Sequence, residues 1–275
     1  MRLLVAGEAR VDAGKTTFAA GLVRALARRS VAASAFKPRA GNDYWYDHDD
    51  VRAATADGRL YGKDVRRLLD AAGSDATPEA RNPVHRLWRP APGRVGLLGE
   101  ADRTFLVDRV STPDGPVWLY NADADVPELV RERLPISEAL AVDSVAAFND
   151  AMREYHLPAL DSLAADVRAT DDAVVESYGD VANPLAGVRY DAVATVAPGR
   201  ARVYDGDRWA VACEAAAGGP DEGRMEEHVG RVTGMVDPVS THALPALSGA
   251  ERDDADAVAD ANREVYETLV ATARE

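Results

Sequence analysis

Short apolar runs alternate with amphipathic stretches along the chain, and this alternation predicts strands and helices in turn. Residues 3–6 form an apolar run that ends at Gly7, which is typical of a buried parallel strand. Apolar side chains at helical spacing over 17–29 predict a helix, and residues 31–36 predict a second strand that stops before Pro38. A strand, a helix and a strand in this order predict a βαβ unit.

The pattern continues with a helix expected over 60–72 and short buried strands over 173–176 and 190–197. Residues 39–58 are polar and irregular, and residues 74–99 are rich in proline and glycine, so we expect both segments to be mostly loop. Together these elements predict an α/β fold with a mainly parallel sheet.

An antiparallel hairpin is expected within this pattern. Strand-like residues 104–110 and 117–120 flank a Pro-Asp-Gly-Pro turn sequence at 113–116, inside an insertion over about 94–136. Further helices are expected from Ser137, as N-cap, to about Tyr155, and over 159–169, 207–217, 222–235 and 253–274. We expect residues 1–275 to form a single domain.

Composition narrows the class of protein. The net charge of −14 argues against a nucleic-acid-binding face, because phosphates require basic side chains. No apolar stretch approaches the length of a membrane span, and the N-terminus does not resemble a signal peptide. Cys213 is the only cysteine, so neither an internal disulfide nor a cysteine-built metal site is expected. These features predict a soluble cytoplasmic protein without nucleic-acid or membrane partners.

The charged residues have an unusual balance. The sequence contains 30 Asp and 16 Glu against 29 Arg and only three lysines, Lys15, Lys37 and Lys63. An acidic, lysine-poor surface keeps a protein hydrated, and this composition indicates a salt-adapted, halophilic host. Two of the three lysines lie beside the ends of the first predicted strands.

The strongest functional motif, GEARVDAGKTT from Gly7 to Thr17, lies between the first strand and the first helix. Glycine allows a tight turn in which backbone amides converge on phosphate oxygens, and the positive end of the following helix points to the same place. Lys15 is expected to reach the β- and γ-phosphates of a nucleotide, and the Thr16 hydroxyl to ligate Mg²⁺. The loop is atypical, because Ala9 stands where the usual first glycine would be. The expected nucleotide-binding residues are Asp12, Ala13, Gly14, Lys15, Thr16 and Thr17.

Two further charged residues end predicted strands. Lys37 lies between Phe36 and Pro38 after the second strand, and Glu176 ends the strand over 173–176. Because ligands bind at the carboxyl ends of parallel strands, Lys37 is expected to stabilise a transferring phosphoryl group or hold a substrate carboxylate. Glu176 is expected to bind Mg²⁺ or position its water. The plainer alternatives are a surface lysine and a carboxylate that caps the next loop.

Residues 42–50 form an acidic and aromatic segment. Its four carboxylates, one histidine and three aromatic rings provide a stacking surface and candidate Mg²⁺ ligands, among them Asp49 and Asp50. Asn42 and Asp43, with Asn82 further along, are candidates for substrate binding. In so acidic a chain the segment is equally consistent with a solvated face.

In combination these motifs resemble the dethiobiotin synthetase family of P-loop enzymes. The family's long first loop, of the G-T-D-T-x-V-G-K-T kind, is matched loosely by Gly7 to Thr16, and its aromatic-Lys-Pro strand end by residues 36–38. The other matches are Asp49 or Asp50 for an aspartate that opens a helix, Asn82-Pro83 and Pro90 for an Asn-Pro segment, and Val174 to Glu176, Gly179 and Pro184-Leu185 for V-x-E-G-A-G-G-x-x-x-P-L. Residues 177–180 (Ser-Tyr-Gly-Asp) replace the family's small G-A-G-G turn.

The resemblance implies a three-layer α/β/α P-loop NTPase fold with an inserted β-hairpin, and a homodimer. In that family the loop lysine and threonine hold ATP and Mg²⁺, an Asp and the Glu ligate Mg²⁺, and the strand-end lysine contacts the reacting carbamate. These roles would pass to Lys15, Thr16, Asp49 or Asp50, Glu176 and Lys37.

The sequence therefore predicts an Mg²⁺- and ATP-dependent enzyme that phosphorylates a carboxylate or carbamate of a small molecule, which an amine then attacks in a ligase-type reaction. The alternative is a nucleotide-switched dimeric ATPase of the MinD/ParA kind that acts on a protein partner. Arg10 favours this alternative, because it stands five residues before Lys15, where that class carries a signature lysine.

Overall fold

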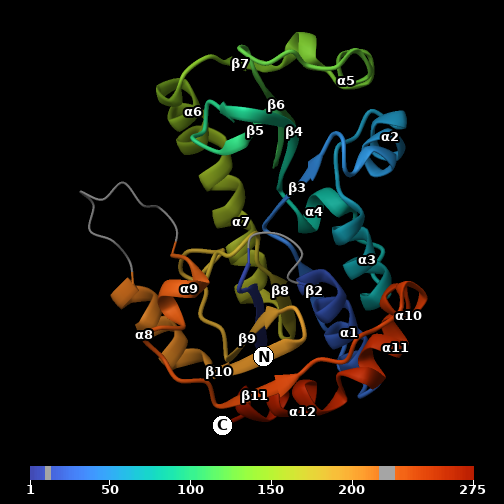
Figure 1. Ribbon diagram of the computed structural model, residues 1–275, viewed down its shortest axis with the longest axis vertical. Helices are drawn as coiled ribbons and strands as arrows, with labels where there is room; N and C mark the ends of the chain where they lie inside the picture. Colours follow the sequence, from blue (N-terminus) through green and yellow to red (C-terminus); the bar gives the residue numbers. More distant parts are fainter. Residues whose placement is uncertain (10–13, 217–226) are drawn as a thin grey trace. The chain divides into compact units, whose positions relative to one another are not determined.

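The computed structural model describes residues 1–9, 14–216 and 227–275, which form two compact units, each with its own sheet (Figure 1). The α/β class expected from the sequence is confirmed, because both units combine a sheet with helices. The first unit comprises Met1–Pro38, Arg67–Ala76 and Ala164–Glu275, and the second comprises Arg39–Arg66 and Thr77–Leu163.

The first unit is built on a six-stranded sheet in the order β11-β10-β9-β1-β8-β2. β2, β8, β1 and β9 are parallel neighbours, whereas β10 pairs antiparallel with both β9 and β11. The mainly parallel sheet expected from the sequence is confirmed in this unit, with β10 and β11 as additional strands. The bounds are β1 Arg2–Gly7, β2 Ser34–Phe36, β8 Ala173–Glu176, β9 Ala192–Ala197, β10 Arg200–Asp205 and β11 Ser240–Ala243.

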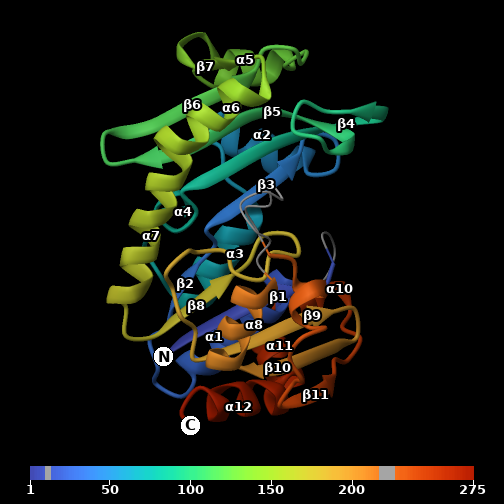
Figure 2. The ribbon, with the colours of Figure 1, turned by 90° about the vertical axis from the view of Figure 1, so that its left-hand side faces the viewer.

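Helices cover both faces of this sheet (Figure 2). On one face Leu3 of β1 belongs to a core that includes Leu22 of α1 and Leu269 of α12. On the other face Tyr204 of β10 packs against Trp209 of α8, with ring centroids 5.0 Å apart. The helices are α1 Lys15–Ala27, α8 Gly206–Ala216, α9 Val229–Val232, α10 Gly249–Asp253, α11 Ala255–Ala261 and α12 Arg263–Thr272, and α3 Lys63–Ala72 and α7 Leu157–Ala169 contribute residues to both units.

The second unit has a five-stranded sheet in the order β3-β4-β5-β6-β7. β5 pairs antiparallel with β4 and β6. At the two edges, β3 pairs parallel with β4 and β7 pairs parallel with β6. The expected hairpin is confirmed as β5 and β6. The elements are β3 Arg39–Asp43, β4 Val84–Val95, β5 Ala101–Thr112, β6 Gly115–Asn121, β7 Leu140–Val142, α2 His48–Ala56, α4 Pro78–Arg81, α5 Glu128–Arg133 and α6 Val145–Ala151.

Two segments that we expected to be loop are regular. Residues 39–58 hold β3 and α2, and residues 74–99 hold α4 and the long strand β4. The prolines of β4, Pro90 and Pro92, lie near its exposed end, where its register against β5 shifts. Proline is tolerated there, because a strand end or bulge needs no continuous ladder of N–H donors.

Two helix expectations were also wrong in their bounds. The helix expected from Ser137 begins instead at Val145, because the side chain of Ser144 accepts the capping hydrogen bond from the Ala147 N–H. The single helix expected over 253–274 is divided into α11 and α12, and α10 ends at Asp253, just before them. Asp254 caps α11 with its side chain, and Asn262 separates α11 from α12.

A buried group of charged side chains lies in the second unit. Arg86 donates two hydrogen bonds of 2.6 Å to the fully buried carboxylate of Asp108. His156 Nε2 lies 2.9 Å from Asp108 Oδ2, at the end of the π-helical turn Met152–His156. Burial alone would raise the pKa of Asp108. Arg86 and His156 lower it by a larger amount, so the pKa of Asp108 lies below its ordinary value.

Candidate functional site

The carboxyl ends of three parallel strands meet at one edge of the first unit's sheet. β1 lies beside β8, with Val5 paired to Glu176, and β2 lies on the other side of β8. Gly7 ends β1, Glu176 ends β8, and Lys37 directly follows β2. This edge is where ligands bind in open parallel sheets.

Thr16, Lys37 and Glu176 form a buried polar cluster at this edge. The Thr16 hydroxyl donates a hydrogen bond of 2.7 Å to Glu176 Oε1, and Lys37 Nζ donates to the same oxygen at 2.5 Å. Lys37 Nζ also donates to Thr16 Oγ1 at 3.4 Å. Lys37 is 4% exposed and Glu176 is 1% exposed, so each charge neutralises the other where water has little access.

Lys15 begins α1 and lies over the end of β1, where it is largely buried. A Cβ atom at Gly7 would come within 2.7 Å of Lys15 Nζ and 3.0 Å of the Gly179 carbonyl oxygen. The absence of a side chain at Gly7 therefore provides the space that the Lys15 side chain occupies. Gly14 precedes α1 with a φ of 79°, which glycine adopts without strain. The helix dipole directs partial positive charge to the same edge as the lysine.

The chemistry of this cluster fits a magnesium–nucleoside triphosphate. Glu176 Oε2 is buried and has no hydrogen-bond partner among the described residues, which is costly for a carboxylate oxygen unless a ligand satisfies it. A threonine hydroxyl and a carboxylate are oxygen ligands of the kind that Mg²⁺ prefers. Lys15, at the positive end of α1, has the charge that phosphate binding requires.

Part of the expected phosphate loop is not described. Asp12 and Ala13 lie outside the described residues, as does Arg10, on which the switch-ATPase alternative depends. Thr17 is described, and its hydroxyl accepts a hydrogen bond of 3.2 Å from Arg67. Thr17 therefore connects α1 to α3.

The expected substrate-binding residues Asn42, Asp43 and Asn82 belong to the second unit. Asn42 is buried in β3. The Asp43 carboxylate accepts hydrogen bonds of 2.8 and 3.2 Å from two backbone N–H groups of the following turn. Buried Asn82 donates a hydrogen bond of 2.9 Å to the Val84 carbonyl. The contacts of Asp43 and Asn82 thus stabilise the local backbone. Substrate binding by Asn42, Asp43 and Asn82 stays a prediction.

Asp49 and Asp50, the candidate metal ligands from the acidic segment, lie on α2 in the second unit. Asp49 is exposed, whereas Asp50 Oδ2 lies 3.4 Å from Lys63 Nζ. Burial raises the pKa of Asp50 above its ordinary value, although Lys63 opposes the shift. In residues 1–9, 14–216 and 227–275, no group of three or more His, Cys, Asp or Glu side chains is arranged to hold a metal ion.

Glu8 belongs to this edge of the sheet, although the sequence analysis did not single it out. Its carboxylate accepts hydrogen bonds of 2.8 Å from the Thr195 hydroxyl and 2.5 Å from Arg200, and Arg202 lies 3.5 Å away. These contacts attach the residue that follows β1, the second residue of the expected phosphate-loop motif, to β9 and β10. The position of Glu8 after a predicted strand was a visible signal, but its partner Thr195 lies 187 positions away.

Comparisons of the chain with protein-family models, with curated proteins and with solved structures each found no match. Within the part of the chain that is described, no helix is long and apolar enough to cross a membrane. The side chains at the sheet edge are therefore the basis for the proposed function.

Proposed function

We propose that the first unit is a P-loop NTPase domain that binds Mg²⁺–ATP at the edge formed by β1, β8 and β2. Its mainly parallel sheet with helices on both faces is compatible with the three-layer fold of that class. The observation that supports the proposal best is the buried cluster of Thr16, Lys37 and Glu176 beside Lys15. It combines a hydroxyl, a strand-end acid and two ammonium groups at a helix N-terminus, as phosphoryl transfer requires.

In this proposal the enzyme transfers the γ-phosphoryl group to a carboxylate or carbamate of a small molecule, as in dethiobiotin synthetase-like ligases. Lys15 holds the β- and γ-phosphates, and Thr16 and Glu176 provide oxygen ligands to the metal. Bound Mg²⁺ neutralises phosphate charge. Lys37 holds the acceptor carboxylate and stabilises negative charge on the group in transfer.

The proposal is tested by measuring ADP release from Mg²⁺–ATP in concentrated KCl. The assay compares wild type with Lys15→Ala, with and without diaminopelargonate plus bicarbonate. We expect Lys15→Ala to reduce turnover about 100-fold, because an ammonium contact to two phosphates is lost. Lys63→Ala is the matched control, because Lys63 is 68% exposed on the second unit and should leave turnover unchanged.

Each result has a distinct meaning. Stimulation by the two substrates, absent from Lys15→Ala, supports a dethiobiotin-forming ligase. Basal turnover that depends on Lys15 but not on the substrates supports the nucleotide site and rejects this acceptor, and other carboxylates are then assayed. Turnover that is the same in wild type and Lys15→Ala would reject the nucleotide site.

A further inference from the structure

The ammonium group of Lys37 contacts one oxygen of each residue that we assign to the metal. It is 2.5 Å from Glu176 Oε1 and 3.4 Å from Thr16 Oγ1, and these two oxygens are themselves joined by a hydrogen bond of 2.7 Å. Lys37 thus has the position and the charge of a cation bound by the pair.

The burial of this group explains why a cation is needed there. Glu176 is 1% exposed, and an ionised carboxylate at such a site requires a counter-charge to offset its desolvation. Lys37, itself 4% exposed, supplies that charge from the neighbouring strand end. A divalent ion would supply it equally well.

The ammonium and a magnesium ion compete for these oxygens. Mg²⁺ binds oxygen at about 2.1 Å, so an ion that approached Thr16 and Glu176 Oε1 from the side of Lys37 would overlap the volume that Lys37 Nζ occupies. From either side, two cations on one carboxylate oxygen would repel each other in a site with little water to screen them. The binding of one cation therefore favours the departure of the other.

We propose that Lys37 is a tethered counter-ion that Mg²⁺–nucleotide displaces from Glu176, and that only the displaced ammonium is free to hold the acceptor carboxylate. This inference rests on the proposed function, and it adds an order of events: metal and nucleotide bind first, and the acceptor carboxylate binds second. In the metal-free protein the same ammonium holds the Glu176 carboxylate and the Thr16 hydroxyl in place through these hydrogen bonds. Acceptor binding and metal loading are thereby coupled through one side chain.

The scarcity of lysine allows a direct test. The chain has three lysines, so a protein labelled with ¹³C at lysine Cε gives three side-chain signals by NMR. The conservative variants Lys15→Arg, Lys37→Arg and Lys63→Arg assign them. A non-hydrolysable ATP analogue is added first with EDTA and then with excess Mg²⁺, and no turnover is required.

We expect the Lys15 signal to shift when the analogue is added with EDTA, and the Lys37 signal to shift only when Mg²⁺ follows. Lys63, which is 68% exposed on the second unit, serves as the internal control. A Lys15 shift with an unchanged Lys37 signal would overturn the inference while keeping the proposed function, since the metal would then use Glu176 Oε2 alone. A Lys37 shift without metal would also overturn it, and unchanged Lys15 and Lys37 signals would overturn both proposals.

Discussion

Gly7 occupies the most restricted position of the candidate site. A Cβ atom there would meet the flexible end of Lys15 at 2.7 Å and the Gly179 carbonyl at 3.0 Å. The lysine can move aside at little cost to the fold, but it then leaves the position from which we propose that it contacts phosphate.

We therefore expect Gly7→Ala to weaken the binding of a fluorescent ATP analogue about tenfold, because a charge-assisted contact is misplaced. The melting temperature should change little. Gly249→Ala is the control, because nothing lies within 4 Å of a Cβ atom at that position. Unchanged affinity in Gly7→Ala would show that Lys15 does not need its present position.

Asp108 is the residue whose charge contributes most clearly to the second unit. It is fully buried and bound by Arg86 and His156. Its pKa is lowered on folding, so its contribution to stability is complete above the ordinary aspartate pKa of about 3.9 and is lost as the pH falls below that value.

At pH 7 we expect Asp108→Asn to lower the free energy of unfolding of the second unit by about 3 kcal/mol, because Arg86 loses its buried partner. Urea unfolding followed by circular dichroism measures this difference, with Asp114→Asn in the exposed β5–β6 turn as control. The gap between wild type and Asp108→Asn should narrow as the pH falls below about 4. An equal gap at pH 7 and pH 3 would contradict this account.

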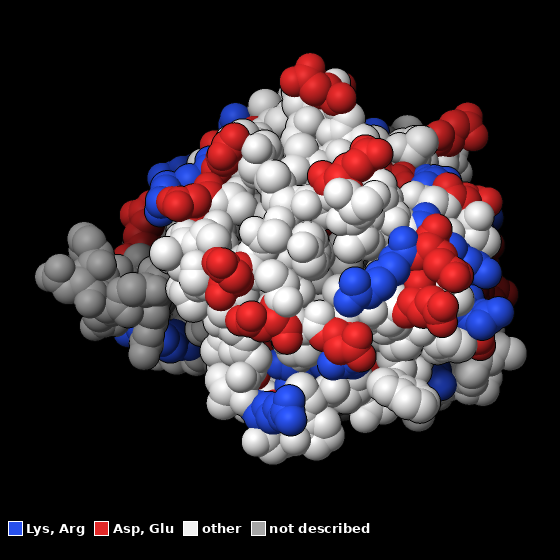
Figure 3. Space-filling model, turned by 90° about the horizontal axis from the view of Figure 1, so that it is seen from above, with Lys and Arg blue, Asp and Glu red and all other residues white. Residues whose placement is uncertain are grey.

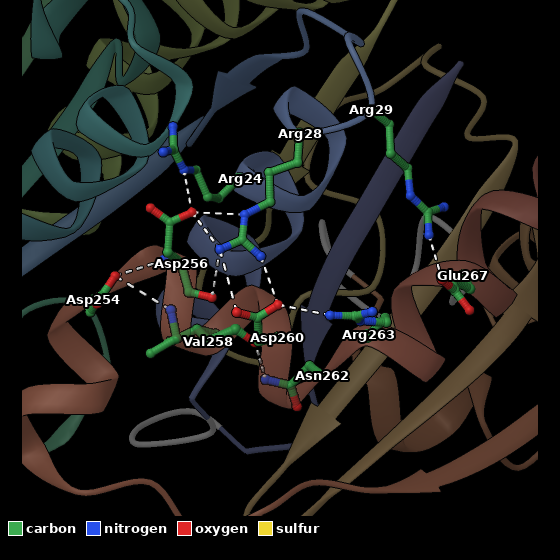
Figure 4. Close-up of polar contacts among 11 residues, drawn as sticks. Arg24, Arg28, Arg29, Asp254, Asp256, Val258, Asp260, Asn262, Arg263 and Glu267 are labelled. Atoms are coloured by element: carbon green, nitrogen blue, oxygen red, sulfur yellow. Dashed lines mark hydrogen bonds and ion pairs between the residues drawn. The ribbon is translucent and has the colours of Figure 1, made fainter.

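At the scale of elements, α1 is held by close packing on one side and by ion pairs at its exposed end. A Cβ atom at Gly21 would lie 2.4 Å from Val258 of α11 and 2.6 Å from the Tyr266 hydroxyl of α12, so the helices approach closely only because this residue is glycine. Figure 4 shows Asp256 of α11 beside Arg24 of α1 and Arg28, the C-cap residue of α1. Arg24 and Arg28 donate hydrogen bonds of 2.7 and 2.8 Å to the Asp256 carboxylate.

We expect Gly21→Ala to destabilise the first unit by about 2 kcal/mol, because the added methyl group overpacks this contact. Chemical unfolding measures it, and Gly230→Ala is the control, since a Cβ atom there would meet open space. Asp256→Asn should cost less than Gly21→Ala, because its ion pairs are exposed to solvent. The reverse ranking would show that the ion pairs, and not the packing, hold α1.

The elements also differ in how well the sequence predicted them. β1, α1 and β8 were predicted within about two residues, because short apolar runs and helical periodicity are local signals. β4 was missed, because its two prolines are turn residues in most contexts and are tolerated here only at an irregular strand end. The C-terminal segment is divided at Asp254, which caps α11, and at Asn262, which precedes α12. Both residues are polar, so the spacing of apolar residues does not predict the breaks.

At the scale of the whole molecule, the excess of negative charge is the main influence on how stability depends on salt. The net charge is −14, and in the view of Figure 3 acidic side chains are interspersed with basic ones rather than separated from them. Self-repulsion of the excess carboxylates destabilises the folded chain, and salt screens it. Salt also weakens exposed ion pairs such as those of α1, which act in the opposite direction.

We expect repulsion to outweigh these pairs, so the melting temperature should rise by several degrees as KCl increases from millimolar to molar concentration. Differential scanning fluorimetry of the wild-type protein measures it. A titration at constant ionic strength with different salts is the control for specific ion binding. A melting temperature that falls with KCl would mean that the ion pairs dominate.

The sequence by itself determined the local elements around the site and the residue types at their ends. Lys37 follows one strand and Glu176 ends another, as the apolar pattern predicted, and Lys15 and Thr16 begin the helix that the pattern predicted from residue 17. This was possible because strand and helix periodicities are properties of adjacent residues.

Only the tertiary structure decided which of these side chains touch. Lys37 and Glu176 are 139 positions apart, and their contact depends on β2 and β8 being neighbours in the sheet. The same holds for Glu8 with Thr195 and for the room that Gly7 leaves to Lys15. Strand order is set by the packing of distant segments, so no local pattern encodes it.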